Sequence, residues 1–205
     1  MSAAVDPSTV IAWGVADAPL EGAVISGDTY VVAPFRDGVL VGVIDGLGHG
    51  PEAEEAARRS ADLLRSKASD RLAELVQECH QDLRRTRGAV LSLAVFRANE
   101  PAMSWVGVGN VEGLLVRARA ERARQSIALR GGVVGYQLPA LRVESHPVSR
   151  GDVLVLATDG VRGAFGDEVN VADEPERIAK GILERHAKGS DDALVLVARY
   201  VGGAP

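Results

Sequence analysis

The chain has 205 residues, a size that one hydrophobic core can serve, so we expect a single domain over residues 1–205. Hydrophobic residues make up 46% and charged residues 25% of the chain, which excludes a disordered or collagen-like protein. The net charge of −5 gives no electrostatic reason to bind nucleic acid or an anionic membrane surface.

The chain carries one cysteine, Cys79, which cannot form a disulfide within the chain. A reducing, cytoplasmic compartment fits this composition. The sequence shows neither a secretory leader pattern nor a run of about 20 apolar residues, so we expect no membrane partner. We expect the protein to be a monomer.

Short apolar runs bounded by Gly, Asp or Pro predict nine strands. In chain order they are residues 9–15, 29–35, 39–44, 89–96, 103–108, 113–117, 126–129, 153–157 and 193–200. The turn tripeptide Arg36-Asp37-Gly38 separates the second and third runs, so these two strands should pair as an antiparallel hairpin.

Three segments have a helical period instead. Residues 51–67 begin with a proline followed by acidic residues, which is typical of a helix N-terminus, and they carry an alanine-rich stripe. A second amphipathic helix is expected over residues 72–83 behind a Ser69 cap, and a third includes residues 178–183. Because the strands are too apolar to leave both faces in water, we expect sheets covered by helices.

Aspartates recur at the ends of the most apolar strands. Asp45 and Asp159, each followed by Gly, end two of them, Asp28 begins another, and the pair Asp191-Asp192 precedes the last. A carboxylate at the mouth of a buried strand is costly unless it is paired, hydrogen-bonded or bound to a cation. Oxygen ligands without a Cys or His cluster favour hard cations such as Mg²⁺ or Mn²⁺, and several converging carboxylates suggest two ions. Taken alone, each Asp-Gly pair also fits a plain turn.

Five segments resemble, in order, the motifs of the metal-dependent PPM (PP2C-type) serine/threonine phosphatases. They are Gly27-Asp28-Thr29-Tyr30, Asp45-Gly46-Leu47-Gly48-His49-Gly50-Pro51-Glu52-Ala53, Gly107-Val108-Gly109-Asn110, Thr158-Asp159-Gly160-Val161 and Asp191-Asp192-Ala193-Leu194-Val195. The second segment is specific for the bacterial sporulation and stress-response branch of the family. The resemblance spans residues 25–200 and implies an α+β fold, an α-β-β-α sandwich of two mainly antiparallel sheets flanked by helices.

The resemblance also implies a site and a reaction. Two Mn²⁺ or Mg²⁺ ions would be bridged by Asp45, and the other ligands would be the Gly46 carbonyl, Asp159 and Asp191, with Asp28 holding water at the ions. Asp45 and Asp159 would be the catalytic carboxylates, and a water bridging the metals would attack the phosphoryl group. The position of the following apolar strand favours the first residue of the Asp191-Asp192 pair as the ligand.

The implied substrates are phosphorylated STAS-domain proteins of a stress-signalling complex, dephosphorylated at serine or threonine. Two alternatives stay open. The chain could be a binding protein of the same fold without turnover, although its acidic positions are all present. It could also be a carboxylate metallohydrolase that acts on small phosphoesters.

The sequence departs from the animal-type members of the family at two places. Residues 20–26 contain no basic residue where those members have an arginine that grips phosphate, so the metals must carry more of that binding. Leu47 stands where those members have a histidine that is a candidate acid, and His49 follows two residues later. The role of His49 is therefore open between proton donor and structural residue, while Asn110 is expected to shape a turn near the metal cleft.

Overall fold

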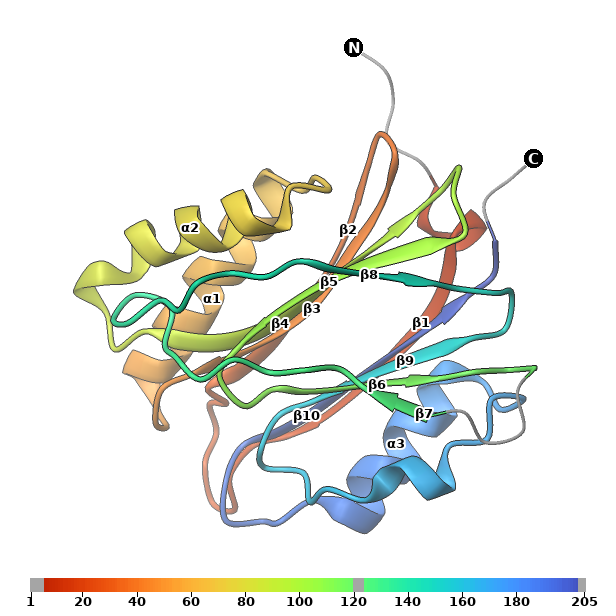
Figure 1. Ribbon diagram of the computed structural model, residues 1–205. Coiled ribbons are helices and arrows are strands. Elements are labelled where there is room, and N and C mark those ends of the chain that lie inside the picture. Colours follow the sequence, from red (N-terminus) through yellow and green to blue (C-terminus); the bar gives the residue numbers. More distant parts are fainter. Residues whose placement is uncertain (1–5, 120–123, 203–205) are drawn as a thin grey trace.

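The structure is a computed structural model that describes residues 6–119 and 124–202. These residues form two five-stranded antiparallel sheets packed face to face (Figure 1). The first sheet has the order β1-β10-β9-β6-β7, with β1 Ile11–Ala18, β10 Ala193–Tyr200, β9 Val153–Ala157, β6 Glu112–Val116 and β7 Arg124–Ser126. The second has the order β2-β3-β4-β5-β8, with β2 Asp28–Phe35, β3 Gly38–Gly46, β4 Ala89–Arg97, β5 Ala102–Val108 and β8 Glu144–Pro147.

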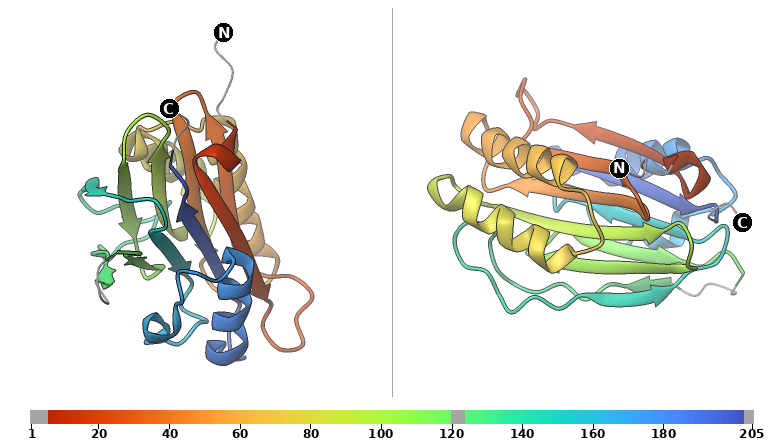
Figure 2. Two further views of the ribbon diagram at one scale, coloured as in Figure 1. Left: turned by 90° about the vertical axis from the view of Figure 1, so that its right-hand side faces the viewer. Right: turned by 90° about the horizontal axis from the view of Figure 1, so that it is seen from above.

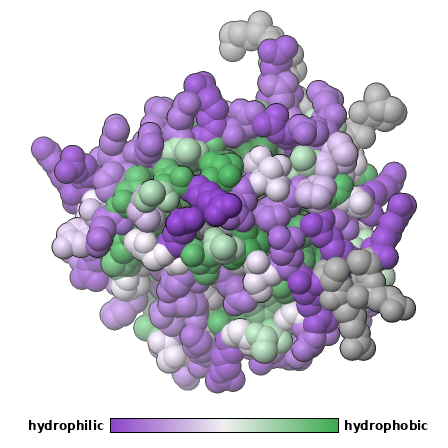
Figure 3. Space-filling view, in the orientation of Figure 1, coloured by the Kyte–Doolittle hydropathy of each residue, from purple (hydrophilic) through white to green (hydrophobic). Residues whose placement is uncertain are grey.

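Helices cover the outer face of each sheet (Figure 2). Helices α1 (Pro51–Ser66) and α2 (Leu72–Asp82) lie on the sheet that contains β3, and α3 (Pro175–His186) lies on the sheet that contains β10. Short 3-10 helices occupy Pro7–Thr9, Leu83–Arg85 and Phe165–Glu168. The expected α-β-β-α sandwich is confirmed. Its surface is mainly hydrophilic on the face shown in Figure 3, with apolar areas between the charged residues.

Successive side chains of a strand point to opposite faces of its sheet. They therefore pack in three apolar layers, one between the two sheets and one between each sheet and its helices. In β3, Val43 faces the layer between the two sheets, whereas Leu40 and Ile44 face α1 and α2. In β10, Leu196 faces the layer between the sheets and Val197 faces α3. A strand that is buried on both faces has a continuous run of apolar residues in its sequence. This is why β3 and β10 could be located from the sequence.

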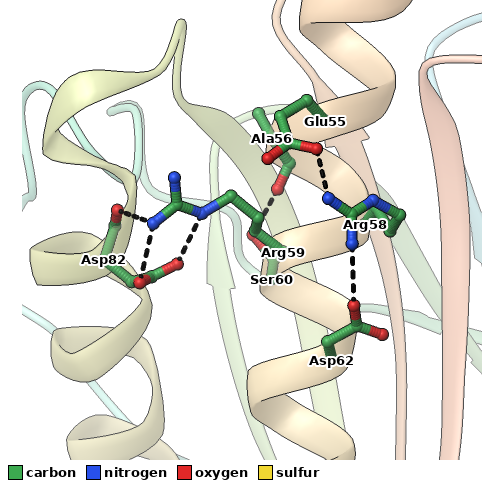
Figure 4. A network of polar contacts seen from close by, with 7 residues as sticks. All are labelled: Glu55, Ala56, Arg58, Arg59, Ser60, Asp62 and Asp82. Atoms are coloured by element: carbon green, nitrogen blue, oxygen red, sulfur yellow. Dashed lines mark hydrogen bonds and ion pairs between the residues drawn. The ribbon is translucent and has the colours of Figure 1, made fainter.

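Helix α1 packs closely on the sheet through its alanines and is joined to α2 by an ion pair. Arg59 donates from Nε and Nη2 to the two carboxylate oxygens of Asp82 at 3.0 and 2.9 Å (Figure 4). Inside α1, the Ser60 hydroxyl donates to the carbonyl of Ala56 at 2.9 Å. A two-pronged arginine contact fixes orientation, so it sets how the two helices lie against each other.

The N-terminus of α2 differs from the expectation. Arg71 occupies the N-cap position, its side chain does not cap a helix amide, and its carbonyl accepts the amide of Leu75 at 3.1 Å. The expected Ser69 cap is wrong, because the helix begins at Leu72 and Ser69 lies two residues before the cap position. Cys79 is buried in the layer under this helix, as expected from its apolar stripe.

The strands agree with the prediction to within two residues at each end, except at β1, β7 and β8. Strand β1 covers Ile11–Ala18 where residues 9–15 were expected, because Pro7–Thr9 form a 3-10 helix. The hairpin across Arg36-Asp37-Gly38 is confirmed by the antiparallel register of β2 and β3. Strand β7 begins two residues and ends three residues earlier than expected, and β8 was not expected at all. Strand β8 is a four-residue edge strand that includes Pro147, and such strands lack an apolar pattern. None of the helices in the two described ranges is long and apolar enough to span a lipid bilayer.

Candidate metal centre

Asp28 and Asp45 occupy facing positions on β2 and β3, where they are partners in the antiparallel register. Partners in such a pair point to the same face of the sheet. Asp45 lies two residues beyond Val43, so its side chain continues the row that faces the space between the sheets. The two carboxylates therefore lie together at one end of the hairpin.

A cleft of about 590 Å³ opens at this end of the sandwich. Three predicted site residues, Asp45, Asp159 and Asp191, line it. Asp159 follows β9 and Asp191 precedes β10, so three strands bring carboxylates to one place. Asp28 lines a different hollow, beside α1. A larger hollow of about 710 Å³ lies beside α3, and its described lining includes none of these four residues.

Two glycines let the strand ends pack closely against neighbouring backbone. A Cβ on Gly46 would lie 2.0 Å from the carbonyl oxygen of Ala53 in α1. A Cβ on Gly160 would lie 1.9 Å from the carbonyl oxygen of Asp192. Neither position accepts a side chain unless the backbone moves. The two glycines therefore allow α1 and the start of β10 to lie close to these strand ends.

The carboxylates around the cleft influence one another electrostatically. Burial, together with the charges of Asp28, Asp159, Asp191 and Asp192, raises the pKa of Asp45 to about 8. Burial likewise raises the pKa of Asp28 to about 7, with added repulsion from the other aspartates. Like charges this close resist ionising together, so the site favours a positive charge among them.

The residues fit a divalent cation. The Oδ2 atom of Asp28 is buried and accepts no hydrogen bond from the described part of the chain. A buried carboxylate oxygen without a donor is costly, and a cation or its bound water would satisfy it. The predicted site residues that line the cleft offer carboxylate oxygens, which are ligands of Mg²⁺ and Mn²⁺, whereas Gly46 is not among the lining residues.

The side chains alone do not form a complete coordination sphere. Within residues 6–119 and 124–202, no three His, Cys, Asp or Glu side chains come together as a ready-made metal site. Magnesium keeps several of its waters and is commonly held by one or two carboxylates. An open cleft with carboxylates on several sides therefore suits a hydrated ion.

Asp191 and Asp192 face different surroundings. Asp191 lines the cleft, whereas Asp192 is only 4% exposed. The carboxylate of Asp192 accepts the backbone amide of Leu20 at 2.8 Å and that of Gly27 at 2.7 Å. Asp191 therefore faces the cleft and Asp192 faces backbone amides beside it, and the choice of Asp191 as a metal ligand stays a prediction.

Two contacts to Asp159 were not foreseen from the sequence. Asn110 donates from Nδ2 to Oδ2 of Asp159 at 2.7 Å and also lines the cleft, so it does more than shape a turn. Lys188 donates from Nζ to the backbone carbonyl of Asp159. The Gly-Val-Gly-Asn motif placed Asn110 near the site, but no pattern in the sequence identifies its partner 49 residues away.

The histidines divide into one in the cleft and three elsewhere. The side chain of His49 is exposed, lines the cleft and forms no hydrogen bond to a described residue. His80 accepts the amide of Gly135 at 3.0 Å, and His146 and His186 contact polar side chains outside the cleft. A structural role therefore suits these three better than it suits His49.

Comparison with known proteins places this geometry in a family. The family model described as "Stage II sporulation protein E (SpoIIE)" matches residues 36–201, which is most of the chain. The chain belongs to the SpoIIE family. Its enzyme class is phosphatase, in agreement with the expectation from its resemblance to the PPM (PP2C-type) phosphatases.

One known protein and two solved structures are similar to this chain. "Phosphoserine phosphatase RsbX" of Bacillus subtilis (strain 168) is 25% identical over 161 residues, which cover 78% of this chain and 76% of the relative. A solved structure described as "The bacterial stressosome: a modular system that has been adapted to control secondary messenger signaling" is 28% identical, with a TM-score of 0.82, and the match covers 92% of this chain and 99% of the other. RsbX in complex with magnesium has a TM-score of 0.84 at 19% identity, covers 98% and 100% of the two chains, and shares the fold.

Proposed function

We propose that this protein is a Mn²⁺- or Mg²⁺-dependent protein phosphatase that hydrolyses phosphoserine or phosphothreonine on STAS-domain proteins of a stress-signalling complex. The observation that carries the proposal is the meeting of Asp45, Asp159 and Asp191 at one cleft, with Asp28 half-buried beside them. A relative is described as a phosphoserine phosphatase, and a structural neighbour is described with the words "The bacterial stressosome", which supports the choice of substrate class.

The residues of the cleft have distinct parts in this proposal. Asp45, the Gly46 carbonyl, Asp159 and Asp191 would hold two ions, and Asp28 would hold water beside them. When bound, the ions supply activation of water and neutralisation of the phosphoryl oxygens. Asn110 fixes one oxygen of Asp159 and thereby orients the other.

The shape of the cleft favours a protein substrate over a small phosphoester. Several residues that line it, including His49, Asn110 and Ser190, are exposed on loops. A phosphorylated side chain that projects from a folded protein can reach such a site, whereas enclosed pockets bury most of a small ligand. We therefore expect folded phosphoproteins to be hydrolysed faster than free phosphoserine.

The test is phosphate release from a phosphorylated STAS-domain protein in Mn²⁺, in Mg²⁺ and in EDTA. We expect Asp45→Asn and Asp159→Asn to lower turnover by roughly 100-fold or more, because each removes a charge that holds an ion. Asp37→Asn is the matched control, because Asp37 is exposed in the turn at the opposite end of the same hairpin. Its turnover should equal that of the wild type.

Three results would contradict the proposal. Equal turnover in EDTA excludes the metal mechanism. Equal hydrolysis of free phosphoserine and of the phosphoprotein favours a hydrolase of small phosphoesters. Tight binding of the phosphoprotein without turnover in either metal favours a binding protein of the same fold.

A further inference from the structure

Asp192 joins the start of β10 to the loop between β1 and β2. It is 4% exposed, and its two carboxylate oxygens accept backbone amides from both ends of this loop. Oδ1 accepts the amide of Leu20 at 2.8 Å, and Oδ2 accepts the amide of Gly27 at 2.7 Å. The bonded residues are 172 and 165 positions away in the sequence, so one side chain closes the loop against a distant strand.

The loop has few other attachments. Between these two anchor points the described backbone bonds are a long contact from Glu21 to Gly189 at 3.5 Å and a local turn from Ala23 to Leu20 at 2.8 Å. Val24 at the tip is 96% exposed. Because the tip packs on so little, the end of the loop is fixed by the two bonds to Asp192 and by a local bond from the Asp28 amide to the Ser26 hydroxyl at 3.1 Å.

Gly27 connects the end of the loop to two residues of the candidate metal centre, Asp28 and Gly46. It directly precedes Asp28, and its carbonyl accepts the amide of Gly46 at 3.0 Å. A Cβ on Gly27 would lie 3.0 Å from the Cβ of Ala53, so the residue fits tightly against α1. A chain of two hydrogen bonds therefore runs from Asp192 through Gly27 to Gly46.

We propose that Asp192 is a positioning residue that sets the metal affinity of the cleft by fixing Asp28 and Gly46 through Gly27. This inference rests on the proposed function, because it takes Asp28 and the Gly46 carbonyl as parts of the metal site. The role requires a carboxylate, since both oxygens must accept a hydrogen bond. An asparagine offers one acceptor only, and its amide group would face a backbone N–H.

The chain contains a matched control at another place. Asp152 is 2% exposed and accepts the amides of Ala118 at 2.9 Å and Ser149 at 3.0 Å. It also accepts from Arg117 at 3.0 Å, and it does not line the cleft. Asp152→Asn therefore breaks the same kind of buried contact without touching the path to Gly46.

The experiment measures Mn²⁺ binding by isothermal titration calorimetry for the wild type, Asp192→Asn, Asp192→Ala and Asp152→Asn. Melting temperatures in EDTA and hydrogen exchange of residues 20–28 are recorded for each. We expect Asp192→Asn to weaken Mn²⁺ binding by about tenfold, the effect typical of a residue that orients metal ligands. Exchange of the loop amides should rise, while Asp152→Asn lowers the melting temperature and leaves the Mn²⁺ affinity unchanged.

Several outcomes would overturn the inference. Unchanged Mn²⁺ affinity in Asp192→Asn, with the wild type active, removes the role of Asp192 and leaves the proposed function intact. An equal loss of affinity in Asp152→Asn would show that general destabilisation is the cause. If Asp192→Ala does not fold, the asparagine variant and the exchange of residues 20–28 still decide the matter. A wild-type chain that binds no Mn²⁺ overturns the proposed function together with this inference.

Discussion

Asp28 and Asp45 face each other across the β2–β3 hairpin, and burial raises the pKa of both, to about 7 and about 8. In the unfolded chain both titrate near the ordinary value of 3.8. The native state therefore binds more protons than the unfolded state between these values, and stability falls as the pH rises through this window.

The first prediction concerns the pH dependence of stability without metal. In EDTA, we expect the free energy of unfolding to fall by on the order of 2 kcal/mol between pH 5 and pH 8, after allowance for solvent screening of these half-buried groups. Asp45→Asn should reduce this fall, because the amide does not ionise. Urea unfolding at the two pH values measures it, and an unchanged pH dependence in the variant would contradict the coupling.

The second prediction concerns Asn110. Its Nδ2 donates to Asp159 at 2.7 Å, a hydrogen bond to a charged group. We expect Asn110→Ala to lower turnover and Mn²⁺ affinity by about tenfold, because Asp159 loses the contact that orients it. Asn170→Ala is the control, since Asn170 is exposed and makes only a local bond to the amide of Ala172. Equal effects of the two variants would exclude a specific role.

The third prediction concerns the contact between Gly46 and α1. Gly46→Ala places a Cβ 2.0 Å from the carbonyl oxygen of Ala53, so the helix or the strand must move. We expect a loss of about 2 kcal/mol or more in the free energy of unfolding, together with weaker Mn²⁺ binding. Gly131→Ala, where a Cβ meets no atom within 4 Å, should leave stability nearly unchanged. Similar stability in both variants would show that the close approach is not needed.

The fourth prediction tests His49 as the proton donor to the leaving oxygen. A serine alkoxide needs this proton, whereas p-nitrophenolate leaves without it. We expect His49→Ala to slow hydrolysis of a phosphoserine protein by roughly 100-fold, the usual size of such an effect, and to leave p-nitrophenyl phosphate hydrolysis nearly unchanged. Equal slowing of both substrates would point to metal or substrate positioning, and no slowing would leave His49 without a part in the reaction.

The sequence determined the elements of the fold and the acidic positions of the site. Strands such as β9 and β10 could be placed at their observed bounds because burial on both faces requires uninterrupted apolar residues. The start of α1 at Pro51 could also be predicted, because helix-start signals are local. Strand β8 could not be predicted, since a short edge strand is held by its neighbour and not by its own composition.

Only the tertiary structure decided which side chains meet. The sequence favoured Asp191 over Asp192 as the residue in the cleft, but it gave no partner for Asp192, whose two contacts depend on how the loop after β1 packs against the start of β10. The contact of Asn110 with Asp159 likewise joins the end of one sheet to the end of the other. Local pattern reflects short-range preferences and burial, whereas strand register and the direction of each side chain are set by contacts between segments far apart in the chain.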